Sequence, residues 1–321
     1  MHRLVYPFWN REEHRMRAFW RLLAQVVMLI AGLLLLVPLA TSLEHDAGYD
    51  LIMEFATGLA MVGSVWLCAR LLDRRRMTDL GLRLDRDWWC DLAFGLVLGL
   101  AMIAAFMAIA GGAGWISVRA VPVLGEGETS LSVVLLCSLA EFVLVGVGEE
   151  LLSRGYHLRN LAEGFRCRRI GPRTAIIISV VLSSTVFAAL HLSNEHTSML
   201  SSLNTLLSGI VLALGLVWTG RLALPIGIHI TWNFAQGSLA GLPVSGHAPR
   251  AALLTVTDTG PELWTGGAYG VEGGLLGMLI VLAAIPAMLL WTRVRHGRAE
   301  FATAIAEYGP RPNNEACESL E

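Results

Sequence analysis

Eight apolar stretches dominate the sequence, and each approaches the roughly 20 residues that a helix needs to cross a bilayer. Each stretch is continuously apolar, whereas a strand of a membrane barrel alternates apolar and polar residues over about 10 positions. The sequence therefore predicts an all-α, polytopic integral membrane protein with about eight transmembrane helices. The predicted spans lie near residues 18–43, 51–72, 88–110, 129–152, 174–191, 201–219, 222–240 and 270–292.

The low charge content agrees with a membrane location and excludes other classes of protein. Charged residues make up only 16% of the 321 residues, against about 25% in soluble domains. The net charge of −2 gives no basic field for nucleic acid, so we expect a lipid bilayer around the protein and no nucleic-acid partner. The five cysteines form no C-x-x-C pair, which indicates neither a disulfide framework nor a zinc–thiolate site.

The arginines predict the orientation, because cytoplasmic loops near the ends of spans collect positive charge. All 24 basic residues are arginines. With the N-terminus in the cytoplasm, the external loops contain only Arg119 and Arg250, and every other arginine falls in a cytoplasmic segment. We therefore expect both termini to be cytoplasmic.

The chain has no stretch long and polar enough for a separate soluble domain, so residues 1–321 are predicted to form a single membrane domain. The tail 309–321, rich in Pro, Asn and Glu, is predicted to be disordered. For the longest external connection, 241–268, we expect a flexible loop rather than a lid over the protein. Gly95 and Gly99 have the spacing that lets two helices approach closely in lipid.

The fourth predicted span ends in charged residues, which cost about 2.5 to 3.5 kcal/mol each inside a bilayer and so suggest a function. Its sequence GVGEELLSRG contains Glu149 and Glu150, followed by Arg154. Residues four apart lie on one face of a helix, so Glu150 and Arg154 can pair. Glu149 is rotated by about 100° and is left for another partner. A structural alternative is that the two glutamates cap the span among lipid headgroups.

Two further spans contain polar residues of the kind that hydrolytic sites use. The fifth span ends in FAALH, with His191 last, and the seventh contains HITWN, with His229 and Asn233 four apart on one face. A carboxylate beside imidazoles, with a carboxamide nearby, can activate a water and stabilise an oxyanion. Each residue also has a structural explanation, since a lone histidine can be a packed residue and Asn233 can hold helices together.

GEELLSRG, FAALH and HITWN resemble, in the same order, the motifs E-E-x-x-x-R, F-x-x-x-H and H-x-x-x-N of one family. This is the CAAX protease and bacteriocin-processing (CPBP, Abi) family of intramembrane endopeptidases. The resemblance covers residues 129–240, which would form the catalytic core in spans four to seven. It implies that Glu149 and His191 activate the attacking water and that His229 and Asn233 stabilise the oxyanion. Positioning roles are implied for Glu150, Arg154 and Phe187.

The resemblance implies an endopeptidase that cleaves a membrane-embedded or lipid-anchored protein or peptide. Whether the substrate is prenylated stays open. The segment RRRMTDLGLRL is typical of bacterial members, some of which are linked to bacteriocin processing, so we expect a bacterial cytoplasmic membrane. One alternative is a non-enzymatic immunity or scaffold protein of the same fold. Another is a proton-coupled transporter with the glutamates and histidines as a relay, although the sequence contains no inverted repeat.

The residues leave two mechanisms open. Glu149, His191 and His229 could bind zinc with one position open for water. The sequence contains no H-E-x-x-H helix, however, and the same side chains suit direct catalysis by a glutamate base. We favour the metal-free mechanism and expect no cofactor.

Straight helices would keep the two water-activating residues apart. If the fourth span ended near residue 152, Glu149 would lie at the cytoplasmic face. His191 would then lie about 25 Å away along the fifth span, counted from Thr174. We therefore expect either a fourth helix that continues past Arg154 inside the protein or a tilted or displaced fifth helix. Both require a water-filled cavity within the bundle.

Overall fold

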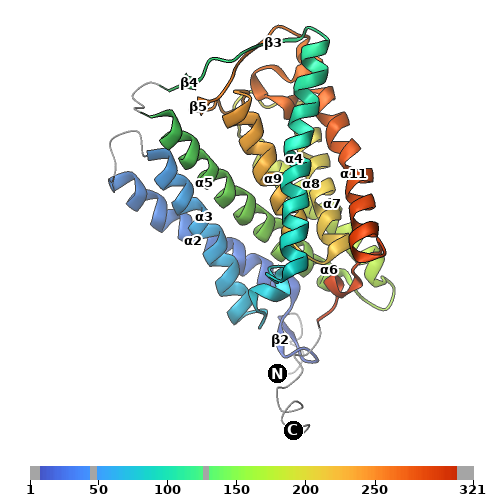
Figure 1. Ribbon diagram of the computed structural model, residues 1–321. Coiled ribbons are helices and arrows are strands. Elements are labelled where there is room, and N and C mark those ends of the chain that lie inside the picture. Colours follow the sequence, from blue (N-terminus) through green and yellow to red (C-terminus); the bar gives the residue numbers. More distant parts are fainter. Residues whose placement is uncertain (1–7, 44–48, 126–129, 309–321) are drawn as a thin grey trace.

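The computed structural model describes residues 8–43, 49–125 and 130–308, and in them the chain forms a helical bundle (Figure 1). Within this part, seven helices are long and apolar enough to cross a membrane. The prediction of an all-α, multi-pass membrane protein is confirmed, whereas the predicted tail 309–321 lies outside the described residues. The long helices are α2 (Ala18–Leu43), α3 (Tyr49–Leu71), α4 (Arg86–Gly112), α5 (Leu131–Glu150) with its continuation, α7 (Pro172–Leu190), α8 (Met199–Thr219) and α11 (Leu275–His296).

The fourth span is longer than predicted and continues through the protein. After α5 the chain passes without interruption into a π-helical segment, η2 (Leu151–Leu158), and then into α6 (Arg159–Phe165). The continuous helix has 35 residues. Glu149 therefore lies about 24 Å from the end of this helix, and His191 lies about 28 Å from the start of the antiparallel helix α7. The extension brings both residues to a similar depth, as the first of the two expected solutions requires.

The seventh predicted span, 222–240, differs from the expectation. It forms helix α9 (Ala223–Phe234) of 12 residues and a π-helical turn, η3 (Ala235–Leu239), of 5 residues. This element is shorter than the seven long helices and packs against α4, α5 and α8 in the middle of the bundle (Figure 1). Ten of the twelve residues of α9 are buried, so its apolar sequence reflects burial in protein rather than contact with lipid.

Glycines hold α4 and α9 unusually close together. A Cβ atom built on Gly95 would lie 2.5 Å from the carbonyl oxygen of Leu224, and one on Gly227 would lie 2.5 Å from that of Leu92. A Cβ on Gly99 would lie 2.3 Å from Oγ1 of Thr231. The prediction that the Gly95 and Gly99 pair serves close helix packing is confirmed.

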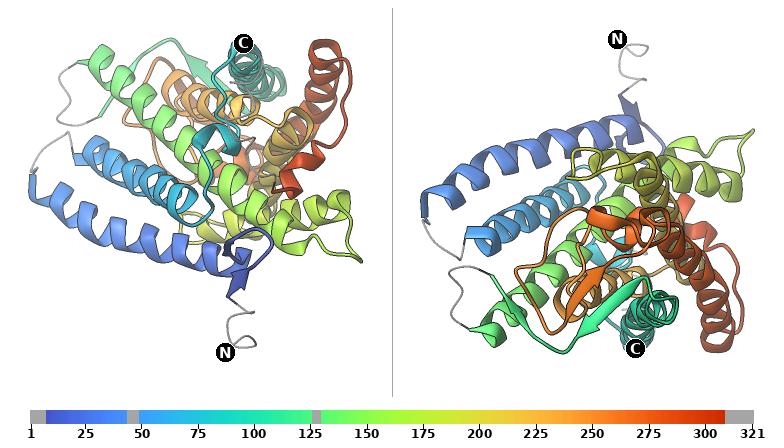
Figure 2. Two further views of the ribbon diagram at one scale, coloured as in Figure 1. Left: turned by 90° about the horizontal axis from the view of Figure 1, so that it is seen from below. Right: turned by 90° about the horizontal axis from the view of Figure 1, so that it is seen from above.

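Short antiparallel ladders cover one end of the bundle. Strand β3 (Ile116–Arg119) pairs with β6 (Thr255–Asp258), and β4 (Val123–Leu124) pairs with β5 (Ala251–Ala252). The connection 241–268 is thus tied to the segment between α4 and α5 instead of forming a free loop, and it crosses the end of the bundle (Figure 2). The short helical turns are η1 (Met77–Leu80), α10 (Glu262–Thr265), η4 (Gly267–Tyr269), η5 (Val271–Gly273) and η6 (Thr303–Ala306).

A buried ion cluster closes the opposite end, where the small hairpin of β1 (Trp9–Asn10) and β2 (Arg15–Met16) lies near α6 (Figure 1). Arg15, Arg21 and Arg75 all contact the carboxylate of Glu163, with Arg15 Nη2 at 2.7 Å and Arg21 Nη2 at 3.1 Å from Oε2. These contacts join the start of α2, the end of α3 and α6. This end of the molecule is rich in arginine, as the sequence predicts.

The close packing of α4 on α9 gives a testable prediction. We expect Gly99→Val to lower the melting temperature of the purified protein in detergent by about 5 °C or more, because overpacking against a backbone costs about 1 to 3 kcal/mol or more. Gly111→Val is the matched control on the same helix, since a Cβ there meets nothing within 4 Å. Equal melting temperatures for the two variants would contradict this account of the packing.

Candidate active site

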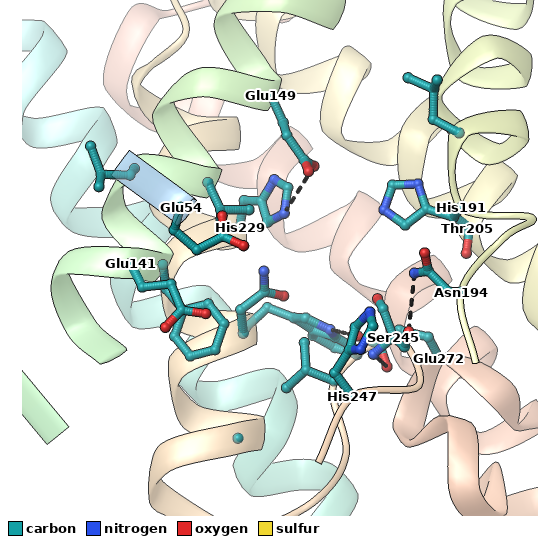
Figure 3. A pocket seen from close by; sticks show the side chains of 18 of the residues that line it. Glu54, Glu141, Glu149, His191, Asn194, Thr205, His229, Ser245, His247 and Glu272 are labelled. Carbon is teal, nitrogen blue, oxygen red and sulfur yellow. Dashed lines mark hydrogen bonds and ion pairs between the residues drawn. The ribbon is translucent and has the colours of Figure 1, made fainter. Parts of the chain in front are cut away.

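A cavity of about 780 Å³ lies inside the bundle, with walls from α2, α3, α5, α7, α8 and α9. The four residues predicted to be catalytic all line it: Glu149, His191, His229 and Asn233. Figure 3 shows Glu149 and His229 on one wall and His191 on the facing wall. The cavity that the sequence required around these polar groups is therefore present.

His229 lies between the two adjacent glutamates. Its Nδ1 donates to Oε1 of Glu150 at 2.9 Å, and its Nε2 lies 3.7 Å from Oε2 of Glu149. Glu150 is completely buried, whereas the Glu149 side chain is 21% exposed and reaches the cavity. Oε2 of Glu149 is buried and makes no hydrogen bond within the described part of the chain, so this carboxylate oxygen has unused capacity to accept one.

The three residues predicted to have positioning roles form one connected series. Arg154 Nη1 donates to Oε1 of Glu150 at 2.9 Å, as the four-residue spacing predicted. Arg154 Nη2 donates to the carbonyl oxygen of Gly209 on α8 at 3.2 Å, and the guanidinium lies 4.3 Å from the ring centre of Phe187 on α7. Arg154 therefore fixes the helix that contains Glu149 and Glu150 against α7 and α8.

His191 caps the end of α7 and is held by the preceding turn. Its Nδ1 lies 2.8 Å from the carbonyl oxygen of Phe187, which can only accept, so Nδ1 carries the proton. The neutral ring then has its lone pair on Nε2. No hydrogen bond or ion pair joins His191 to Glu149 in the described residues, and the two side chains lie on facing walls of the cavity (Figure 3).

Asn233 lies one turn after His229 on α9 and also lines the cavity, with 9% of its surface exposed. The helix changes to π-helical geometry two residues later, at Ala235. The helix that starts as α5 also changes to π-helical geometry, directly after Glu150. Such π segments are rare and are frequent at functional sites.

The residues do not fit a zinc site in this geometry. Among residues 8–43, 49–125 and 130–308, no group of three or more His, Cys, Asp or Glu side chains converges so that it could hold a metal ion. The three predicted ligands, Glu149, His191 and His229, thus do not form such a set, and Nδ1 of His229 is already bonded to Glu150.

Glu272, which no sequence motif marks, is buried in the cavity wall in η5, just before α11. Its carboxylate accepts from Trp232 Nε1 at 2.9 Å and from Gln236 Nε2 at 2.7 Å, and both donors flank Asn233 in the chain. Its carbonyl oxygen accepts from Asn204 of α8 at 2.8 Å. Burial raises the pKa of the Glu272 carboxyl above its ordinary value. A search for ionisable residues inside the predicted span 270–292 would have found it.

The connection 241–268, which crosses one end of the bundle, adds polar groups to the edge of the cavity at that end, which we call the rim. Arg250 forms a 2.8 Å ion pair with Glu141 on α5, and Asn194 Nδ2 donates to the carbonyl oxygen of Ser245 at 3.0 Å. Figure 3 shows Asn194, Ser245 and His247 together on the side of the cavity away from Glu149. The cavity is therefore bounded by the motif helices at one end and by loops at the other.

Comparison with known proteins finds a matching family model. Residues 131–235 match the family model described as type II CAAX prenyl endopeptidase Rce1-like, and this match contains all three motifs. No curated protein and no solved structure matches the chain. The seven long apolar helices make it a multi-pass membrane protein. Segment 131–235 of the chain is thus similar to the Rce1-like family of CAAX prenyl endopeptidases.

Proposed function

We propose that the protein is an intramembrane endopeptidase that hydrolyses a peptide bond of a membrane-embedded or lipid-anchored protein or peptide, with Glu149 as the general base. The observation that carries this proposal is the position of the Glu149 carboxylate. It borders a cavity inside the bundle, 3.7 Å from His229, with His191 and Asn233 on the same cavity. A protease that works within a membrane needs such a polar space, because lipid offers no water to the reaction.

In the proposed reaction a water binds between Glu149 and His191. Glu149 removes one proton, while Nε2 of His191 accepts a hydrogen bond from the other and orients the water. The water oxygen attacks the carbonyl carbon, and the new oxyanion accepts hydrogen bonds from Asn233 and from His229 protonated on both ring nitrogens. Glu149 then gives its proton to the leaving nitrogen, the C–N bond breaks, and a carboxylic acid and a neutral amine are formed. The acid passes the remaining proton of the water to the amine, which leaves a carboxylate and an ammonium group, and Glu149 is again a carboxylate.

We also infer that the protein lies in a bacterial cytoplasmic membrane with both termini in the cytoplasm. The distribution of arginine supports this orientation, since all but Arg119 and Arg250 fall in one set of loops and ends. The loops of that set lie at one end of the bundle, with β2 and α6 (Figure 1).

The general-base role gives a direct test. We expect Glu149→Gln to lower the cleavage rate of membrane-peptide reporters in detergent by at least about 100-fold, because general-base catalysis contributes about 10²- to 10⁴-fold. Mass spectrometry of the products would measure it. Glu300→Gln, at a side chain that is 62% exposed, is the matched control and should cleave like wild type. We expect wild-type cleavage to persist with a zinc chelator.

Other outcomes would change the proposal. Equal cleavage by wild type and Glu149→Gln would contradict the general-base role. Loss of cleavage in chelator, restored by added zinc, would replace the metal-free mechanism by a metal-dependent one. A folded wild-type protein that binds the reporters and cleaves none of a broad panel would favour the non-enzymatic scaffold.

The bonds of Glu272 predict a positioning role. We expect Glu272→Gln to lower kcat by roughly 10-fold or more with a smaller change in KM, because a shift of about 1 Å at a catalytic group can cost 100-fold. The glutamine amide can accept only one of the two bonds from Trp232 and Gln236 and would turn a donor toward the other. The measurement is steady-state kinetics on one reporter. A change in KM alone, or in melting temperature without any change in kcat, would contradict this role.

A further inference from the structure

The cavity is closed on the side of the arginine-rich end. Along the helix that starts as α5, the residues lining it run from Ser138 to Ser153, and none follows Ser153. Against this end of the cavity lies an apolar core cluster in which most side chains show no exposed surface. They include Leu80, Leu151, Tyr156, Leu158, Ile176, Leu216 and Leu222. No residue in this list lines the cavity, so this core separates Glu149 from the arginine-rich end.

The other end of the cavity reaches a solvent-exposed rim. Glu195 and His247, on the loops after α7 and after η3, both line the cavity and are both exposed. The two loops are joined, since Asn194 donates to the carbonyl oxygen of Ser245. A Cβ on Gly246 would lie only 2.1 Å from the carbonyl oxygen of Glu195, so the loops also touch through their backbones. These contacts hold the two loops together, so the rim is a defined edge of the cavity.

The outer helices contribute many apolar side chains to the cavity lining, beside the carboxylates of Glu54 and Glu141. Leu29 and Leu33 of α2, Met53 of α3, and Phe142 and Leu144 of α5 contribute to it. A polypeptide that leaves the bilayer at this end would have apolar surface beside its membrane anchor and polar groups beside its hydrophilic part. The lining therefore suits a membrane-anchored chain better than a small soluble peptide.

We propose that the cavity opens on the extracytoplasmic side and that the substrate is a membrane-anchored polypeptide whose scissile segment lies outside the cytoplasm. The inference rests on the protease function proposed for the same site. Among the arginines that the structure describes, the closed end has those that mark a cytoplasmic face, whereas the rim end has only Arg119 and Arg250. A lipidated C-terminal peptide held at the cytoplasmic face would have to pass through the apolar core to reach Glu149.

Thiol labelling tests the side of the opening without any activity measurement. Cys167 is exposed and lies in the turn between α6 and α7, at the arginine-rich end, while Ala248 is exposed at the rim. One variant would keep Cys167 alone, and the other would contain only Ala248→Cys, all other cysteines being replaced by serine. Both would be expressed in sealed cells and treated with a charged, membrane-impermeant maleimide.

We expect Ala248→Cys to react at least 10-fold more than Cys167 before permeabilisation, and Cys167 to react fully after it. A Cys167 that reacts before permeabilisation would overturn the proposal. An Ala248→Cys that reacts only after permeabilisation would overturn it as well.

A pair of reporters tests the substrate class. Each has the same scissile segment beside a single membrane anchor, in one case outside the cytoplasm and in the other inside. We expect the wild type to cleave only the external reporter and Glu149→Gln to cleave neither. Cleavage of the internal reporter alone would overturn this inference and leave the protease function intact. Cleavage of neither by the wild type would count against the protease function, and the substrate class would fall with it, while the labelling still reports the side of the opening.

Discussion

The site depends on one buried carboxylate oxygen. Oε1 of Glu150 accepts both from Arg154 Nη1 and from His229 Nδ1, each at 2.9 Å, and no part of Glu150 is exposed. Removing Arg154 would leave the buried Glu150 carboxylate with the His229 bond alone, and loss of one partner of a buried ion pair is costly in a protein interior. Since Arg154 also contacts Gly209 and the ring of Phe187, this one group connects α5 and α9 with α7 and α8. The bond from His229 Nδ1 to Glu150 also orients the His229 ring, so that Nε2 points toward Glu149.

The length of the fourth helix explains why Glu149 and Glu150 lie within the bundle. The sequence places them near the end of a predicted span, but the helix continues beyond them. The helix from Leu131 to Phe165 runs on for 15 residues beyond Glu150, first in π-helical geometry. The wider π turn contains Arg154 and Gly155, and a Cβ on Gly155 would lie 3.1 Å from Leu222. Close packing at this glycine and the buried arginine together keep polar residues within the bundle, where a regular lipid-facing helix would exclude them.

The spans and the motif residues could be predicted from sequence because both are local: a span is a continuous apolar run, and spacing by four defines a helix face. The short central helix α9 could not, because hydropathy does not distinguish a residue buried in protein from one exposed to lipid. The π segments could not be predicted from the sequence either. The same holds for the pairing of β3 with β6, because the paired residues Ile116 and Asp258 are far apart in the chain. Glu272 stands apart from every motif, and only the fold brings it beside Trp232 and Gln236.

A hydrolase inside a membrane faces a constraint that a soluble protease does not. It must admit water to a polar cavity without connecting the two sides of the bilayer, because a continuous aqueous path would let ions leak. In this chain the helix that starts as α5 meets both requirements. Its residues up to Ser153 line the cavity, whereas Tyr156 and Leu158 pack into the apolar core. The carboxylate of Glu149 lies on the cavity side of that boundary. The same packing that seals the membrane therefore decides from which side a substrate can arrive.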